Sequence, residues 1–466
     1  MTKKNKNISR RKFLGQSSCM AIGSTTLLST LTNLKFMNAA SIANSSTLLG
    51  GDYKAMVCVL LSGGCDSHNM LIPREQNEHN IYTATRTNLA IPRDQILQLN
   101  GSNYGLHPSM GGVQSLYNEG KLSFLNNIGT LVRPMTKEQV FQNFNDLPLG
   151  LFSHSDQTQQ WQTSIPNDRA SVGWGGRIAD LMSSMNTNPD ISMNVSLSGS
   201  NIFQTGTNSI EYSIDPYNGS VGIVGYNDFG DQYKATIDNM LDAHYNDVFQ
   251  KTYVDVIKTS RDADVAFRAA LENGATFNDV FTANNFSDAL HMIARTIAIR
   301  EELGMSRQIF FVEYGGWDHH DEVLNAQTEM LGYLSDGLNE FNTAMERIGI
   351  NECVTTFISS EFGRTLTSNG NGSDHAWGGN VMVMGGPVNG GQMFGNYPLL
   401  ELGSEYELGG PGGGGIMLPT TSVDEYFAEL ALWFGVAPSE LQTIFPNIGS
   451  FYDTSSGVMP IGFLNT

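Results

Sequence analysis

The chain has 466 residues, of which 40% are hydrophobic and 10% aromatic, so it can bury a sizeable core and is neither disordered nor fibrous. Only 15% are charged and 50 are glycine, which indicates many polar, turn-rich loops. Acidic residues outnumber basic ones by 46 to 26, which gives a net charge of -20. This charge argues against binding to nucleic acid and against binding to anionic membranes through a basic patch. A bound cation, in contrast, would be favoured.

The first 43 residues predict an export signal that is removed from the mature protein. Residues 1–40 contain seven basic and no acidic residues, and the paired Arg10 and Arg11 are followed by an uncharged segment over residues 15–34. This pattern resembles a twin-arginine signal, which implies the twin-arginine export machinery as a partner and a periplasmic or secreted protein. A Sec signal and a retained membrane anchor are the alternatives. The segment is too rich in Ser, Thr and Gly for a good membrane span, so we expect none in the mature chain.

Six short apolar runs, most of them ending at Gly, Ser or an acidic residue, predict strands that are buried on both faces. They cover residues 55–62, 121–128, 193–197, 308–314, 353–359 and 381–384. Four amphipathic stretches, with apolar residues three and four positions apart, predict helices over residues 253–271, 289–303, 322–348 and 423–434. This alternation favours an α/β fold with a mainly parallel sheet.

We expect residues 44–466 to form a single domain with loop insertions near residues 199–240 and 387–420. The second insertion matches the pattern G-x-G-x-x-G only through its many glycines, because no strand precedes it and no helix follows it. The sequence contains no G-x-S-x-G, HExxH or P-loop motif. After the export segment the cysteines are Cys58, Cys65 and Cys353, and we expect buried free thiols rather than disulfides.

Acidic residues and histidines gather where the predicted strands end. Asp66 follows the first strand, Asp318 and His320 follow the fourth, and Asp374 and His375 lie in the loop before the sixth. Ligands of open α/β sheets bind outside the carboxyl ends of the strands, so these residues can converge there. Carboxylates at short range need a cation, and mixed Asp and His ligands suit zinc, manganese or iron, whereas all-oxygen sets suit magnesium or calcium. The alternative is that each carboxylate caps a helix or a turn.

Ser153 and His154 are the candidates for a catalytic role at the start of a polar helical stretch. A hydroxyl at a helix N-terminus beside a metal could attack phosphorus or sulfur, but Ser153 and Asp156 also match a capping-box pattern. Arg364 is the third candidate. Its planar guanidinium could hold an anionic substrate, or it could pair with Glu361.

Five segments together resemble the domain of unknown function 1501 family, namely residues 61–69, 153–154, 316–320, 360–365 and 372–375. That family consists of exported bacterial proteins regarded as distant relatives of the alkaline phosphatase and sulfatase superfamily. The resemblance implies an alkaline-phosphatase-like three-layer α/β/α sandwich with a metal site at the strand ends. It also implies Asp66, Asp318, His320, Asp374 and His375 as ligand candidates and Ser153 as the nucleophile.

Together these features predict an exported, metal-dependent hydrolase that acts on a small anionic phosphate or sulfate ester. Its divalent metal would be zinc, manganese, calcium or magnesium. The alternative is a non-catalytic exported binding or assembly protein that retains the fold.

Overall fold

The computed structural model of the chain describes residues 53–465, apart from 224, 227–228 and 411–413. The predicted export segment, residues 1–43, therefore lies outside the described residues. Residues from Tyr53 onward form one compact unit. Within the described part, none of the helices combines the length and the apolar character that a bilayer crossing requires.

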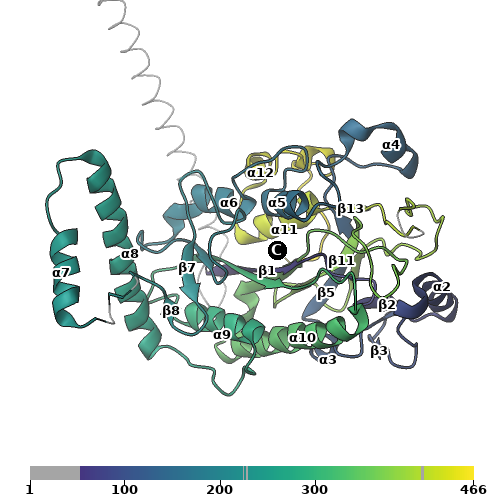
Figure 1. Ribbon diagram of the computed structural model, residues 1–466, viewed down its shortest axis with the longest axis horizontal. Helices are drawn as coiled ribbons and strands as arrows, with labels where there is room; N and C mark the ends of the chain where they lie inside the picture. The colour runs from purple at the N-terminus through teal and green to yellow at the C-terminus, as the bar shows by residue number, and fades with distance from the viewer. Residues whose placement is uncertain (1–52, 224, 227–228, 411–413, 466) are drawn as a thin grey trace, which may run out of the picture. The chain divides into compact units, whose positions relative to one another are not determined.

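A large, mainly parallel sheet forms the centre of the described chain (Figure 1). Its strands are β1 (Lys54–Ser62), β5 (Leu122–Gly129), β6 (Asn194–Ser196), β7 (Tyr212–Asp215), β8 (Gly219–Ser220), β9 (Arg307–Gly315), β10 (Val354–Ser359), β11 (Gly379–Met384), β12 (Met393–Gly395) and β13 (Thr421–Ser422). Their order is β12-β5-β11-β10-β1-β9-β6-β7-β8, with β13 also beside β5. Strand β1 runs parallel to both of its neighbours, whereas β11 is antiparallel to β10 and β5. Each of the six predicted strands belongs to this sheet.

The central strands have the composition that burial on both faces requires. Seven consecutive residues of β1 are buried, and all six residues of β10 and of β11 are buried. A smaller sheet lies beside the main one and consists of β2 (Leu71–Pro73), β4 (Tyr104–Leu106) and β3 (Leu97–Gln98) in that order.

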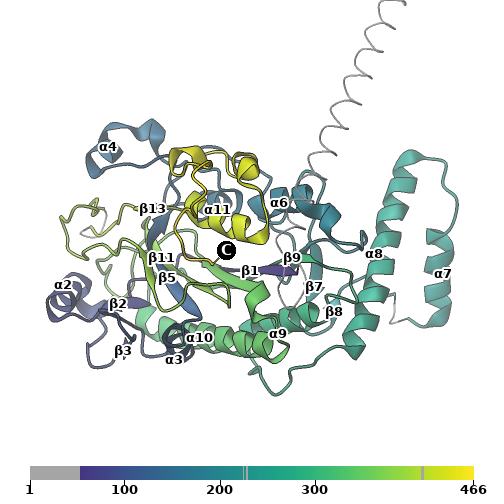
Figure 2. The same ribbon diagram turned by 180° about the vertical axis from the view of Figure 1, so that it is seen from behind.

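Helices cover both faces of the large sheet, which confirms the predicted α/β/α layers (Figures 1 and 2). One face carries α3 (Gly111–Asn118), α9 (Asn285–Ala298) and α10 (Val323–Arg347), and the other carries α5 (His154–Thr163), α6 (Trp174–Met182), α11 (Val423–Phe434) and α12 (Leu441–Ile444). The remaining helices are α2 (Gln76–Arg86), α4 (Lys137–Gln142), α7 (Asp231–Leu241) and α8 (Val248–Asn273). All four predicted helices are present.

Helix α11 also anchors the end of the described chain. Glu429 is fully buried, and its carboxylate accepts hydrogen bonds of 2.7 Å from the backbone amides of Ile461, Gly462 and Leu464. Cys58, Cys65 and Cys353 are buried free thiols, as predicted.

Candidate metal centre

The candidate site forms where three neighbouring strands end. Strands β1 and β9 stay paired up to Ser62 and Gly315, and β10 leaves the sheet at Ser359, beside Leu60. Gly63 follows with a φ of +125°, and a Cβ atom added to it would lie 2.4 Å from the backbone nitrogen of Asp318. Only glycine permits this close approach of the two loops.

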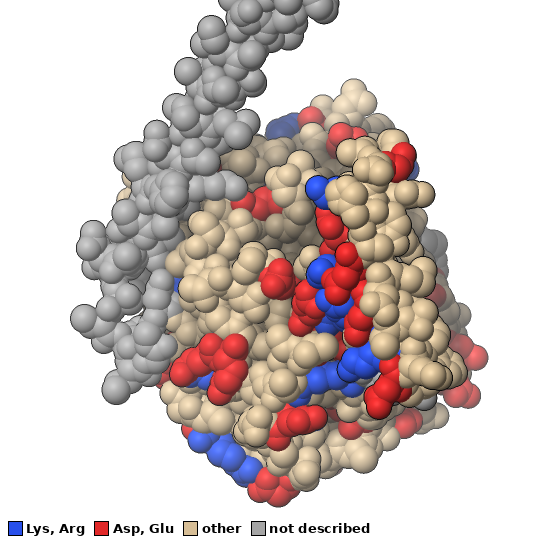
Figure 3. All heavy atoms as spheres, turned by 90° about the vertical axis from the view of Figure 1, so that its left-hand side faces the viewer, with Lys and Arg blue, Asp and Glu red and all other residues tan. Residues whose placement is uncertain are grey.

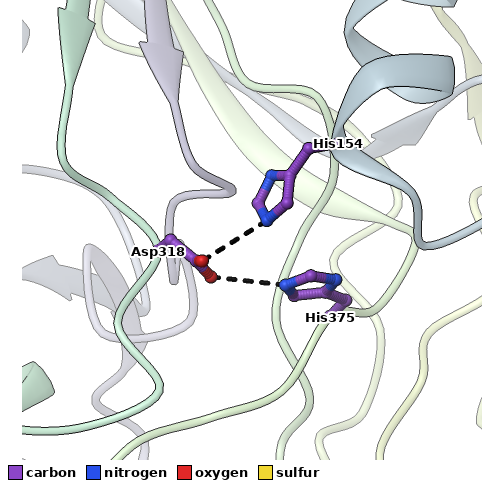
Figure 4. A group of neighbouring side chains, drawn as sticks. All are labelled: His154, Asp318 and His375. Carbon is purple, nitrogen blue, oxygen red and sulfur yellow. Dashed lines mark hydrogen bonds and ion pairs between the residues drawn. The ribbon is translucent and has the colours of Figure 1, made fainter.

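Three side chains from distant parts of the chain meet in this region: His154, Asp318 and His375 (Figure 4). Each offers one ligand atom, and these atoms all lie within 4.8 Å of one another. The Nε2 atom of His154 is 3.5 Å from Asp318 Oδ2, and the Nε2 atom of His375 is 3.3 Å from Asp318 Oδ1. Among the described residues, these three are the His, Cys, Asp or Glu side chains that lie close enough together to hold a metal ion.

His320 extends this group. Its Nε2 atom lies 3.1 Å from Asp318 Oδ1 and 3.0 Å from His375 Nε2. Ligand atoms about 2.0–2.1 Å from a tetrahedral zinc ion are about 3.3 Å apart along each edge. The distances from Asp318 to the three Nε2 atoms, 3.1–3.5 Å, are close to that edge length, whereas His154, Asp318 and His375 are the three residues whose ligand atoms all lie within 4.8 Å of one another.

The other ring nitrogen of each histidine is held by a hydrogen-bond acceptor. His154 Nδ1 lies 2.8 Å from Glu361 Oε1, His375 Nδ1 lies 2.8 Å from the carbonyl oxygen of Phe152, and His320 Nδ1 lies 3.0 Å from Asp374 Oδ1. Carboxylate and carbonyl oxygens only accept, so each Nδ1 donates a proton and each neutral ring presents the lone pair of Nε2 to the common centre. This arrangement of outer partners is typical of metal-ligating histidines.

Two of these lone pairs face each other, an arrangement that a proton or a bound cation would stabilise. With Nδ1 protonated on both rings, His320 Nε2 and His375 Nε2 face each other at 3.0 Å without a proton to share. Burial lowers the pKa of His375, which favours its neutral form. Either an added proton or a bound cation between these rings would therefore be favourable.

Arg364 holds Asp318 in its ionised form. The guanidinium is fully buried and donates to Asp318 Oδ1, to the carbonyl oxygens of Gly63 and Gly64, and to that of Ser373. Partial burial raises the pKa of Asp318, but the hydrogen bond and charge of Arg364 outweigh it and bring the pKa to about 2. As placed, Arg364 acts on Asp318 and on the loops around it, and its donors do not face an open surface.

Asp66 does not belong to the group formed by His154, Asp318 and His375. Its carboxylate is fully buried in an ion pair of 2.5 Å with Arg86, at the end of α2, and it accepts a hydrogen bond of 3.1 Å from Ser373 Oγ. Ser373 directly precedes Asp374 and His375 in the chain. The structure thus joins Asp66 to the loop that carries these residues, not to the common centre itself.

Ser153 is the N-cap of α5. Its hydroxyl oxygen accepts from the backbone amide of Asp156 at 3.4 Å and lies 3.1 Å from Ser155 Oγ. The preceding residue, Phe152, has a φ of +70°, a conformation that L residues rarely adopt, and this turn directs its carbonyl oxygen to His375. A nucleophilic role for Ser153 stays a prediction.

Sequence reasoning did not identify the partners that orient the rings. Glu361 follows the fifth predicted strand and was expected either near the site or paired with Arg364; its 1% exposed carboxylate accepts from His154 and from the backbone amide of Gly63. No sequence motif indicated that the Phe152 carbonyl would accept from His375 or that Arg86 would pair with Asp66. The location of Glu361 directly after β10 was the one available sign, because strand ends at this edge converge.

The structure of this chain is only weakly similar to solved structures of other proteins. A sulfatase from Pseudoalteromonas sp. shares 10% identity, with 87% of this chain and 71% of that chain covered at a TM-score of 0.33. A lipoteichoic acid synthase from Listeria monocytogenes shares 10% identity (82% and 80% covered, TM-score 0.28), and a mutant of the alkaline phosphatase PafA shares 12% (67% and 64% covered, TM-score 0.28). At TM-scores this low, the likeness says nothing about the chemistry of this chain.

Comparison of sequences gives a clear result for the family. No curated protein matches the chain significantly. The model of the family described as "Protein of unknown function (DUF1501)" matches residues 53–407, a range that contains every residue of the candidate metal centre. The chain therefore belongs to the DUF1501 family, as its motifs predict.

Proposed function

We propose that the protein is a metal-dependent hydrolase of phosphate or sulfate esters, with its metal held by His154, Asp318, His320 and His375. The observation that carries the proposal is the convergence of three Nε2 lone pairs on one carboxylate while every Nδ1 is bound by an acceptor. Structural ion pairs do not need this orientation of three rings, whereas metal ligation does.

The charges of the site fit a divalent cation. Three carboxylates, those of Asp318, Glu361 and Asp374, surround the histidines, and Arg364 contributes one positive charge. With neutral imidazoles this leaves two negative charges, which a divalent ion would balance. Three imidazoles and one carboxylate are the ligand types that suit zinc, manganese or iron better than magnesium or calcium.

In this proposal each side chain has a defined task. His154, His320 and His375 bind the ion through Nε2, while Glu361, Asp374 and the Phe152 carbonyl fix the rings. Arg364 keeps Asp318 ionised. A divalent ion held there would supply Lewis-acid polarisation of an ester oxygen.

The substrate and the location of the protein rest on the sequence. A small anionic ester suits the proposed cation, and the resemblance of the first 43 residues to a twin-arginine signal supports export to the periplasm or beyond. The acidic chain speaks against nucleic-acid phosphates as substrates. Ser153 is one proposed nucleophile, because it directly precedes His154 in the chain. A water molecule is the other.

A non-catalytic binding or assembly protein is the second candidate, and one observation favours it. Four protein ligands fill a tetrahedral zinc site, and structural zinc sites are closed in this way, whereas catalytic sites keep one position open. If all four side chains bind together, the ion would stabilise the fold and leave no position for an ester.

The test combines metal analysis with activity. The purified protein is analysed for bound metals, and hydrolysis of a panel of phosphate and sulfate esters is measured with and without chelator. We expect about one divalent transition metal per chain and an activity that is lost in His375→Ala and His320→Ala. His244→Ala, which removes an exposed histidine outside the site, serves as the matched control.

The outcomes separate the two candidates. Stoichiometric metal without turnover of any ester favours the binding protein. A folded protein that takes up no metal, even after dialysis against zinc or manganese, refutes both the metal centre and the hydrolase.

A further inference from the structure

The helical hairpin of α7 and α8 stands at one side of the layered sandwich (Figures 1 and 2). The C-terminal half of α8 packs against the body, where Phe267 and Leu271 are buried and Phe267 contacts Tyr212 with ring centroids 6.0 Å apart. The N-terminal half extends beyond β7 and β8 together with α7. The two halves of one helix therefore lie in different surroundings.

One face of α8 carries apolar side chains in both halves of the helix, with Ser260 between them. Phe249, Tyr253 and Val256 stand four and three residues apart, and the spacing continues to Phe267 and Leu271, so all of them share one helix face. In the C-terminal half this face is covered. In the N-terminal half it is exposed: 82% for Phe249, 69% for Tyr253 and 57% for Val256. We call Phe249, Tyr253 and Val256 the exposed stripe.

Helix α7 does not cover the exposed stripe, because it pairs with another face of α8. Arg261 of α8 binds Asp238 of α7 at 2.8 Å, and Lys258 binds Asp242, just after α7, at 2.5 Å. On a helical wheel, positions 261 and 258 lie about 110° and about 170° from the centre of the stripe. The stripe thus remains without a partner among the described residues.

The charges around the stripe argue against a membrane as its occupant. Residues 229–273 contain eight acidic and five basic residues, and on this side of the molecule the two signs lie next to one another without a basic patch (Figure 3). Interfacial helices that bind anionic lipid carry Lys and Arg on their polar face. The residues that flank the stripe on α8, Gln250, Thr252 and Thr259, are uncharged.

The area of the stripe matches what a dimer needs. Aromatic side chains bury about 150–250 Å² each, so the exposed fractions of Phe249 and Tyr253, with Val256, amount to roughly 400 Å² of apolar surface. A stable interface buries about 800 Å² per partner, of which about 57% is apolar, or roughly 450 Å². A two-fold axis across α8 would place the exposed stripes of two copies against each other, with uncharged residues at their margins.

We propose that the exposed stripe of α8 is a homodimer interface, in which it packs antiparallel against the same stripe of a second copy of this chain. Each copy supplies the apolar surface that the other lacks. Because the chain carries a net charge of -20, the two copies repel each other over their remaining surface. Added salt should therefore tighten the dimer by screening this repulsion, in contrast to an interface made of ion pairs.

The experiment is sedimentation equilibrium of the purified full chain and of Phe249→Asp and Tyr253→Asp variants, at low and high salt. Wild type should be dimeric at micromolar concentration. Since the interface contains each residue twice, either variant should raise the dissociation constant by ~100-fold or more, with unchanged circular dichroism and melting temperature. Phe144→Asp, at a phenylalanine that lies outside the hairpin and is 71% exposed, should leave the dimer intact.

Two results would overturn the proposal. A wild type that stays monomeric at ~100 μM, far above typical micromolar constants, would leave another protein as the occupant of the stripe. A dimer that persists in both stripe variants would place self-association elsewhere on the chain. Neither result bears on the metal centre, since no residue of the stripe contacts it.

Discussion

Substitutions of Asp374 measure how the site orients His320. Asp374 Oδ1 accepts from His320 Nδ1 at 3.0 Å and from Asn369 Nδ2 at 2.9 Å, so in the proposed metal centre this carboxylate would act on the metal through the ring of His320. Removing such an outer partner costs about 10- to 100-fold in metal affinity, or ~1.4–2.7 kcal/mol. We expect this loss for Asp374→Ala. Asp374→Asn should lose less, because an amide oxygen still accepts from Nδ1.

The assay is a zinc titration in competition with a chromogenic chelator near neutral pH. Asp321→Ala is the matched control: this nearby carboxylate accepts from Asn371 and from the backbone amide of Glu322, not from a histidine ring. A loss beyond about 1,000-fold in Asp374→Ala would show that Asp374 is itself a ligand. Unchanged affinity in both Asp374 variants would show that His320 does not bind the metal. Either result refutes the positioning role.

Two further predictions concern the loops and the core. Gly63→Ala places a Cβ 2.4 Å from the backbone nitrogen of Asp318 and should reduce zinc affinity at least tenfold in the same titration. Gly101→Ala is the control, because Gly101 has a φ of +69° and open space around it, and it should not reduce the affinity. Equal affinities of the two variants would contradict the close-approach argument. Burial raises the pKa of Asp424 from 3.8 to about 7, so the folded chain keeps a proton that the unfolded chain releases, and stability falls as pH rises from about 4 to about 7. Asp424→Asn should remove this loss of up to ~4 kcal/mol in urea unfolding, and a parallel pH dependence of the two proteins would refute the assignment.

The sheet could be predicted because its central strands are buried on both faces. In β1 this burial selects an unbroken apolar run before Ser62, and in β10 a run of β-branched and apolar residues before Ser359, and such runs can be recognised without any long-range information. The short strands β7 and β8 lie in the segment predicted as an insertion, and with four and two residues that mix polar and apolar types they gave no such pattern.

The site could be predicted only as far as strand ends converge. Asp318, His320 and His375 meet, and His154 joins them, because β1, β9 and β10 are adjacent. Asp66 also follows one of these strands, β1, but its carboxylate forms an ion pair with Arg86. Arg86 lies twenty positions further along the chain, and α2 brings it back to Asp66. Whether the Asp66 carboxylate pairs with the Arg86 guanidinium or binds a metal ion depends on the packing of α2. The local sequence around Asp66 does not reveal this packing.

The burial of Glu429 matters for anyone who prepares this protein. The family match ends at residue 407, yet the amides that donate hydrogen bonds to this carboxylate lie at residues 461–464. A gene shortened to the match would discard α11 altogether, and one shortened to residue 460 would strand a desolvated acid, at ~1–3 kcal/mol for each missing donor. Any truncation or tag should therefore leave residues 461–464 in place, so that their amides keep donating to Glu429.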